Sequence, residues 1–140
     1  MKTTIYSIYI LMMVSFFSAC GQQENRERKG ATSTDVDMIT NNTIKQAFEA
    51  WQRGNSKLWL SFFTKDARLY DDGKLRDFHK FSTHAIGEEW FISLDKIEDN
   101  GLSIYGKIHT KKWGDFKTYF KFRINDQGKI YRLDIGQADY

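Results

Sequence analysis

Residues 116–125, FKTYFKFRIN, decide the fold class, because apolar and hydrophilic side chains alternate along the whole stretch. One face of the extended chain carries Phe116, Thr118, Phe120 and Phe122. The opposite face carries Lys117, Tyr119, Lys121 and Arg123. A period of two predicts a β-strand, and a strand with one apolar side is typical of an antiparallel sheet that is covered on that side only.

Three neighbouring segments share this period and predict further strands, at residues 89–98, 102–110 and 129–136. The connections are short and contain Asp99-Asn100-Gly101, Trp113-Gly114 and Asp126-Gln127-Gly128. Glycine, asparagine and aspartate suit tight hairpins because they tolerate positive φ angles. The second half of the chain therefore predicts a meander of four antiparallel strands.

The segment before these strands has a period of 3.6 residues and predicts three helices, at about residues 40–54, 56–63 and 75–85. In the first of them, the apolar stripe consists of Ile44, Ala47, Phe48 and Trp51. A short strand at residues 67–70 and the turn Asp71-Asp72-Gly73 lie between the second and third helices. Three helices followed by long antiparallel strands predict an α+β fold.

The start of the chain predicts a secretory signal that ends before Cys20, the only cysteine. A charged start is followed by a mostly apolar run from Ile5 to Phe17 and by the small residues Ser18 and Ala19. The next segment, GQQENRERKGATSTDVD, lacks aromatic residues and apolar periodicity, as flexible spacers do. We therefore expect a signal peptide over residues 1–19, a flexible tether over residues 20–38 and one domain over residues 39–140.

The residues around the cleavage site, Phe17-Ser18-Ala19-Cys20-Gly21, resemble the lipobox of bacterial lipoproteins, although Phe17 stands where leucine is usual. The resemblance implies cleavage before Cys20 and acylation of its thiol and of the new amino group. Two or more acyl chains hold a protein stably at a membrane. We expect a bacterial cell-envelope protein, lipid-anchored to a membrane, with its domain in the periplasm or at the cell surface. Plain secretory cleavage and an uncleaved anchor are the alternatives.

Composition argues against several classes of function. The formal net charge is +3, and loss of Lys2 with the signal lowers it by one, which is little charge for a nucleic-acid surface. The sequence has no cysteine pair or carboxylate–histidine cluster with metal-ligand spacing, no glycine-rich phosphate loop and no serine nucleophile elbow. We therefore expect neither a metal nor a cofactor, and no nucleic-acid partner.

The order of elements and a set of landmark residues together resemble the NTF2-like superfamily, in particular its SnoaL-like bacterial members. The landmarks are residues 47–51 (AFEAW), Gly54-Asn55, Phe62-Phe63-Thr64, Asp66-Ala67, Asp71-Asp72, Gly87, Trp113-Gly114 and residues 128–135 (GKIYRLDI). The resemblance covers about residues 38–138. It implies a cone in which a strongly curved, mostly antiparallel sheet packs around three N-terminal helices, and a pocket inside that cone.

Relatives of this kind include ketosteroid isomerases, polyketide cyclases and dehydratases, which need a carboxylate or imidazole base and a hydrogen-bond donor. The resemblance places the base at Asp71 or Asp72. The chain departs from the isomerase pattern in two places, because Gly73 replaces the usual proline and the first helix has Phe48 and Trp51 instead of the donor tyrosine. The alternative is that both aspartates only form a turn.

Asp134 is the second candidate catalytic carboxylate. It lies between Leu133 and Ile135 on the last predicted strand. If Tyr131, Leu133 and Ile135 pack inward, Asp134 faces outward and pairs with a lysine or arginine of a neighbouring strand. If it faces inward, it is a buried carboxylate, which is costly unless it is used or paired.

Four further residues are candidates for contact with a ligand: Trp51, Phe63, Trp113 and His79. Large aromatic residues of a small domain belong to its core in the alternative interpretation, and His79 belongs to the surface. Trp113, beside a hairpin glycine, either covers the sheet edge or leans over the mouth of the pocket.

We expect a non-catalytic domain that binds a small hydrophobic molecule or a protein partner. An enzyme of isomerase, cyclase or dehydratase type, using the pocket carboxylates, is the alternative. A homodimer through the open face of the sheet, which the resemblance also implies, is a third possibility. The lysines and arginine at 117, 121 and 123 would make that face unusually charged for an obligate interface.

Overall fold

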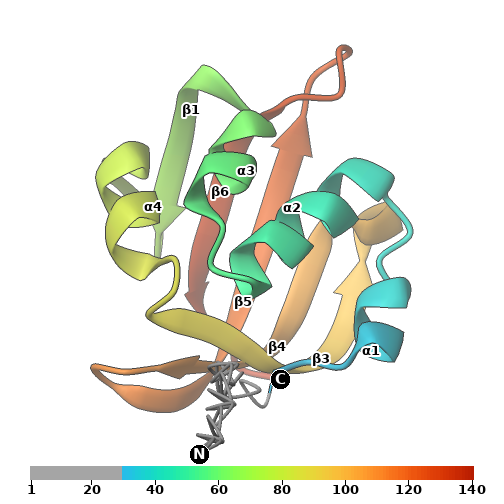
Figure 1. Cartoon of the computed structure of the whole chain (residues 1–140), viewed down its shortest axis with the longest axis vertical. Coiled ribbons are helices and arrows are strands. Elements are labelled where there is room, and N and C mark those ends of the chain that lie inside the picture. Colours follow the sequence, from blue (N-terminus) through green and yellow to red (C-terminus); the bar gives the residue numbers. More distant parts are fainter. Residues whose placement is uncertain (1–29) are drawn as a thin grey trace, which may run out of the picture.

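The computed structural model describes residues 30–140 (Figure 1). The expected signal peptide, the lipidation site Cys20 and the first part of the tether lie outside the described residues. Four α-helices are present in the described part: α1 (Ser33–Asp37), α2 (Asn42–Gln52), α3 (Ser56–Ser61) and α4 (Phe78–Ala85). The strands are β1 (Phe63–Asp71), β2 (Lys74–Arg76), β3 (Glu89–Glu98), β4 (Ser103–Thr110), β5 (Gly114–Ile124) and β6 (Ile130–Gln137). A short 3-10 turn, η1 (Asp99–Gly101), connects β3 to β4.

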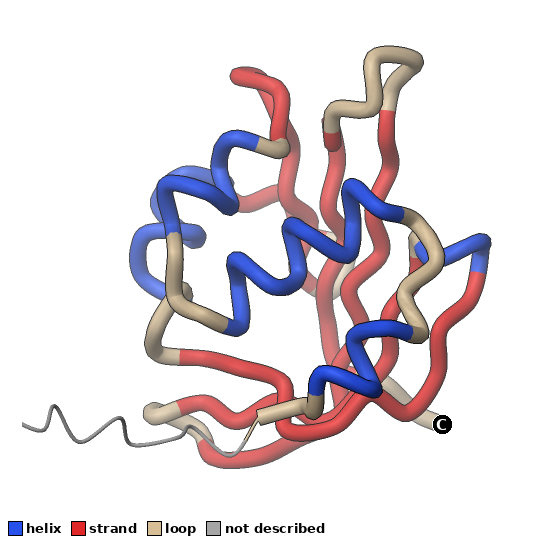
Figure 2. The backbone as a smooth tube through the Cα atoms, turned by 45° about the vertical axis from the view of Figure 1, so that its right-hand side comes forward, coloured by secondary structure: helices blue, strands red, loops and turns tan. Residues whose placement is uncertain are grey.

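All six strands form one sheet in the order β2-β1-β6-β5-β4-β3. The pair β1–β6 is parallel and every other pair is antiparallel, so the sheet is mostly antiparallel. The sheet is curved, and the helices lie on its concave side (Figures 1 and 2). The expected α+β class is therefore confirmed.

The core lies between the helices and the concave face of the sheet. The alternation at residues 116–125 separates a buried face from an exposed one, as expected. Thr118, Phe120 and Phe122 are buried, while the lysines and the arginine of the opposite face are exposed. The apolar stripe of α2 is also buried, and Trp51 packs edge-on against Phe120 at 5.1 Å between ring centroids. Contact between α2 and β5 thus joins the helical and sheet layers.

The structure differs from the expected flexible tether at its C-terminal end. Residues 33–37 form α1, which begins with a reciprocal capping box between Thr32 and Asp35. Val36 and Ile39 are buried, and the backbone N–H of Ala31 donates to the Phe91 carbonyl at 2.8 Å. Two buried residues, Val36 and Ile39, are too few to produce a recognisable periodicity, so this packing could not be predicted from the sequence.

The structure also differs between residues 63 and 78. Strand β1 begins at Phe63 instead of Ala67, and Leu75 and Arg76, expected as the start of a helix, belong to strand β2, which pairs with β1. Asp72 and Gly73 have φ angles of 47° and 77°, which is typical of the two-residue Asp-Gly hairpin turn. Helix α4 starts only after Asp77, whose side chain caps the N–H of Lys80 at 2.9 Å.

Candidate functional site

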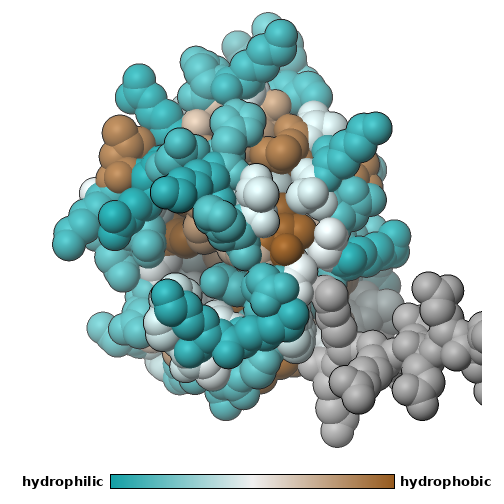
Figure 3. All heavy atoms as spheres, turned by 60° about the vertical axis from the view of Figure 1, so that its left-hand side comes forward, coloured by the Kyte–Doolittle hydropathy of each residue, from teal (hydrophilic) through white to brown (hydrophobic). Residues whose placement is uncertain are grey.

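A cavity of about 1100 Å³ lies between α4, the concave face of the sheet and the turn that connects β4 to β5. Its apolar surface is formed by Phe81, Ala85, Ile108, Phe116, Phe120 and Ile135. On the side of the molecule drawn in Figure 3, hydrophobic side chains are visible in the gaps between hydrophilic ones. Its volume of about 1100 Å³ slightly exceeds the usual range of small-molecule sites, roughly 300–1000 Å³.

Small residues leave this space open. Ala85 faces the cavity from α4, and Thr110, Thr118 and Gly136 line it from the strands. Thr118 is buried and its hydroxyl donates to the Gly136 carbonyl at 2.7 Å, while the Thr110 hydroxyl donates to the Gly114 carbonyl at 3.1 Å. Both hydroxyls are therefore used by the backbone, and the inner wall between them is largely apolar.

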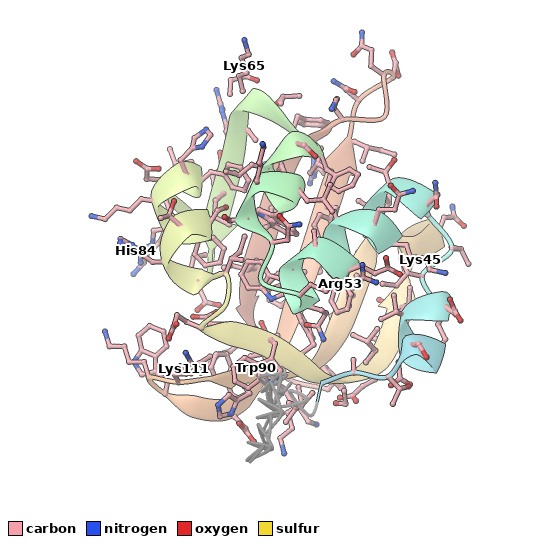
Figure 4. All side chains as sticks on the ribbon, in the orientation of Figure 1. Lys45, Arg53, Lys65, His84, Trp90 and Lys111 are labelled. Atoms are coloured by element: carbon pink, nitrogen blue, oxygen red, sulfur yellow. The ribbon has the colours of Figure 1, made fainter. Side chains whose placement is uncertain are left out.

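Charged side chains of both signs surround the cavity. The acidic ones are Asp71, Asp72, Asp77, Glu88 and Glu89, and the basic ones are Arg76, Lys80, His84, Lys111 and Lys112. His84 and Lys111 lie on the same side of the molecule, from α4 and the β4–β5 turn respectively (Figure 4). Lys111 pairs with Glu88 at 2.9 Å, and the Lys112 ammonium lies 4.7 Å from the Trp113 ring centroid.

Glu89, the first residue of β3, is the carboxylate at this cavity that the sequence analysis missed. It pairs in register with Thr110 and shares the inner face of the sheet with Phe91, which is fully buried. Burial, together with the smaller effect of the negative charge of Asp71, raises the pKa of Glu89 to about 7. The sequence signal for this orientation is that Glu89 stands two residues before Phe91 on one strand, so that both side chains lie on the same face.

Asp71 and Asp72 both line the cavity, as the resemblance implied, but their local roles differ. Asp71 ends β1 opposite Ile135, and one of its oxygens lies 3.8 Å from Arg76 Nε. Asp72 sits in the turn and accepts a hydrogen bond from the Gln137 N–H at 3.2 Å. The Asp72 carboxylate lies so close to Gly136 that a Cβ there would collide with it, and the Asp72 N–H donates to the Ile135 carbonyl at 2.9 Å, which fastens the turn to β6.

Asp134 does not line the cavity, unlike Asp71 and Asp72. It lies on the outer face of the sheet, where Arg132 donates to it from Nε and Nη2, both at 2.7 Å. The Arg132 guanidinium in turn lies 4.1 Å from the Tyr70 ring centroid. Asp134 therefore faces outward, its partner lies on the same strand instead of a neighbouring one, and the structure does not bring it together with Asp71 and Asp72.

Of the four candidate ligand contacts, only Trp113 reaches the cavity, where it is 65% exposed in the β4–β5 turn. Trp51 is fully buried in the core between Trp59 and Phe81. Phe63 is likewise a core residue. His79 is exposed on α4 and does not line the cavity. Within residues 30–140, no group of three potential ligands is placed to hold a metal ion, and no helix is long and apolar enough to cross a membrane.

No protein-family model and no curated protein sequence matches this chain. Solved structures do match its fold. A proposed polyketide cyclase from Sinorhizobium meliloti has a TM-score of 0.59 and 18% identity, over 70% of this chain and 96% of that one. An NTF2-like protein of unknown function from Cytophaga hutchinsonii has a TM-score of 0.54 and 10% identity, over 77% and 91%.

The orange carotenoid protein of Anabaena (Nostoc), solved with canthaxanthin bound, has a TM-score of 0.53 and 18% identity, over 69% of this chain. This chain spans only 35% of the length of that protein. At such identities the likeness establishes the fold, and the chain has the NTF2-like fold that its landmarks resemble. A fold of this kind supports many activities, so the site has to carry the functional argument.

Proposed function

We propose that this domain binds a small hydrophobic molecule in the cavity beneath α4. The observation that carries the proposal is the cavity of about 1100 Å³, whose inner wall is apolar and whose charged groups lie around it. Small-molecule sites are usually concave pockets with a mostly apolar lining and a few polar groups. The likeness to the orange carotenoid protein, which binds canthaxanthin, supports an apolar ligand.

A binding assay with a cavity-filling variant tests this proposal. The mature chain carrying Cys20→Ser can be studied without detergent, and N-phenyl-1-naphthylamine is an uncharged hydrophobic probe that fluoresces on binding. Ala85→Phe should abolish the fluorescence increase, because the new ring occupies the space beside Phe81. Ala138→Phe, outside the cavity lining, is the matched control and should bind like the parent chain. Equal binding by both variants would contradict the proposal.

We further propose that Cys20 is acylated and holds the domain at a membrane of the cell envelope. The described residues begin at Gly30, so nine residues separate Cys20 from the described part of the chain. Whatever its conformation, the chain from Cys20 to Gly30 reaches about 35 Å at most. The start of the domain would then lie within about 35 Å of the lipid surface, from which hydrophobic molecules can be taken up.

A second candidate function, proton-transfer catalysis, is favoured by one specific observation. Glu89 has a pKa of about 7 in a largely apolar cavity, and a carboxyl group that titrates near neutral pH is well suited to act as a general acid or base. An isomerase, cyclase or dehydratase would then use Glu89 with Asp71 in place of Asp134. Glu89→Gln should abolish turnover of such a substrate while the neutral probe still binds; unchanged turnover would exclude this role.

A further inference from the structure

The cavity contains a carboxylate for which the fold supplies no partner. Glu89 is half-buried beside Thr110, whose hydroxyl is already bonded to the Gly114 carbonyl. Among residues 30–140, no hydrogen bond or ion pair reaches the Glu89 carboxylate. A half-buried acid without a partner is costly, and a ligand group that binds it would remove that cost.

The electrostatic environment of Glu89 is negative. Asp71, at the opposite wall of the cavity, is close enough for its charge to raise the pKa of Glu89. The other charged or titratable groups around the cavity are Asp72, Arg76, Asp77, Lys80, His84, Glu88, Lys111 and Lys112. None of the basic groups in this list counteracts the rise in the pKa of Glu89 that burial and Asp71 cause.

Three of the basic side chains have acceptors of their own at the rim. Lys111 pairs with Glu88, Lys112 lies over the Trp113 ring, and Arg76 approaches Asp71 only at 3.8 Å with both side chains about half exposed. Lys80 and His84 are exposed on α4. The space between Glu89 and Asp71 is therefore the part of the cavity where a positive group from outside would be stabilised most.

We infer that the ligand of this cavity is an apolar molecule carrying an amine, whose ammonium group is held by Glu89 with Asp71 beside it. This inference rests on the proposed binding function and narrows its ligand class. The apolar body would lie on Phe116, Phe120 and Ile108, and the ammonium would donate to the Glu89 carboxylate as a charge-assisted hydrogen bond. Such an ammonium gives Glu89 the partner that the fold leaves out.

Three probes of one chain length test the charge preference: dodecylamine, dodecanol and dodecanoate, each displacing N-phenyl-1-naphthylamine from the mature Cys20→Ser chain. At pH 8 the amine should displace the dye at a concentration roughly tenfold lower than the alcohol, the usual scale for one charged hydrogen bond. Glu89→Gln should bring the amine to the level of the alcohol and leave the alcohol unchanged. Glu88→Gln, which alters the neighbouring exposed carboxylate, should retain the preference.

The pH dependence provides an independent readout. If only ionised Glu89 holds the ammonium, affinity for dodecylamine should rise about tenfold from pH 6 to pH 8, while affinity for dodecanol stays constant. His84→Asn should leave this dependence in place, which separates the effect of Glu89 from any effect of the histidine at the cavity. In Glu89→Gln the dependence should disappear.

The possible outcomes distinguish a failure of the proposed binding function from a failure of the inferred preference for an amine. If neither the dye nor dodecanol binds, the proposed function itself is overturned. If both bind but the amine binds no better than the alcohol, or dodecanoate binds best, the inference about the amine is overturned and the binding function stands. A preference for the amine that survives in Glu89→Gln, or disappears equally in Glu88→Gln, overturns it as well.

Discussion

Replacing Glu89 by glutamine should stabilise the domain at alkaline pH and leave its stability unchanged in acid. The pKa of Glu89 rises from 4.5 to about 7 on folding, so the folded state keeps a proton that the unfolded chain releases between these pH values. The contribution of protonated Glu89 to the free energy of unfolding is therefore present in full below pH 4.5 and is lost as the pH rises through 7. At about 1.4 kcal/mol per pH unit the loss is about 3 kcal/mol, or about 2 kcal/mol for a half-exposed group.

Urea unfolding of the parent chain and of Glu89→Gln at pH 4.5 and at pH 8.5 measures this quantity directly. The difference in the free energy of unfolding between the two proteins should be about 2 kcal/mol larger at pH 8.5 than at pH 4.5. All other titrating groups are common to both proteins and cancel in this comparison. Glu88→Gln, at an exposed position, should show the same difference at both values. An equal effect of Glu89→Gln at the two pH values would refute the reasoning.

Three further changes have distinct expected results. Gly106→Ala should lower the free energy of unfolding by about 2–3 kcal/mol, because its Cβ would collide with the Ser93 carbonyl oxygen, and unchanged urea unfolding would contradict this packing. Asp134→Asn should leave probe binding unchanged and cost about 1 kcal/mol or less, since its pair with Arg132 lies partly exposed on the outer face; weaker dye fluorescence would place it at the site. Cys20→Ser should move the protein from the membrane fraction to the soluble one, and retention in the membrane would count against acylation.

The strands could be predicted better than the segments between them. In β5 one face is buried and the other is wet, so the period of two is clear, and Phe120 and Phe122 are buried as expected. Strand β2 has three exposed residues and therefore no period to detect. Its presence depends on the hairpin turn at Asp72, and a helix-like pattern that starts at Phe78 was extended backward across it.

The candidate site could be predicted only in part, because cavity lining depends on which side of a strand a residue faces. Asp71, Asp72 and Trp113 were found from their place in turns, where the resemblance gives them a location. Trp51 was expected near the ligand because of its size, yet size serves the core equally well. Glu89 belongs to the strand expected at residues 89–98, and its inward side follows from its place two residues before Phe91 and opposite Thr110, both of which are buried.

Glu89 joins the stability of the domain to its proposed function. A glutamine or an apolar side chain at this position would avoid the cost of ionisation near neutral pH, and within the described residues no bond of the fold depends on the carboxylate. Residues that lower the stability of a fold and make no stabilising interaction in it are expected at sites of ligand binding or catalysis. A bound ammonium would lower the pKa of Glu89 again and so recover the lost stability. The same carboxylate that destabilises the empty domain above pH 7 would therefore contribute to the stability of the liganded one.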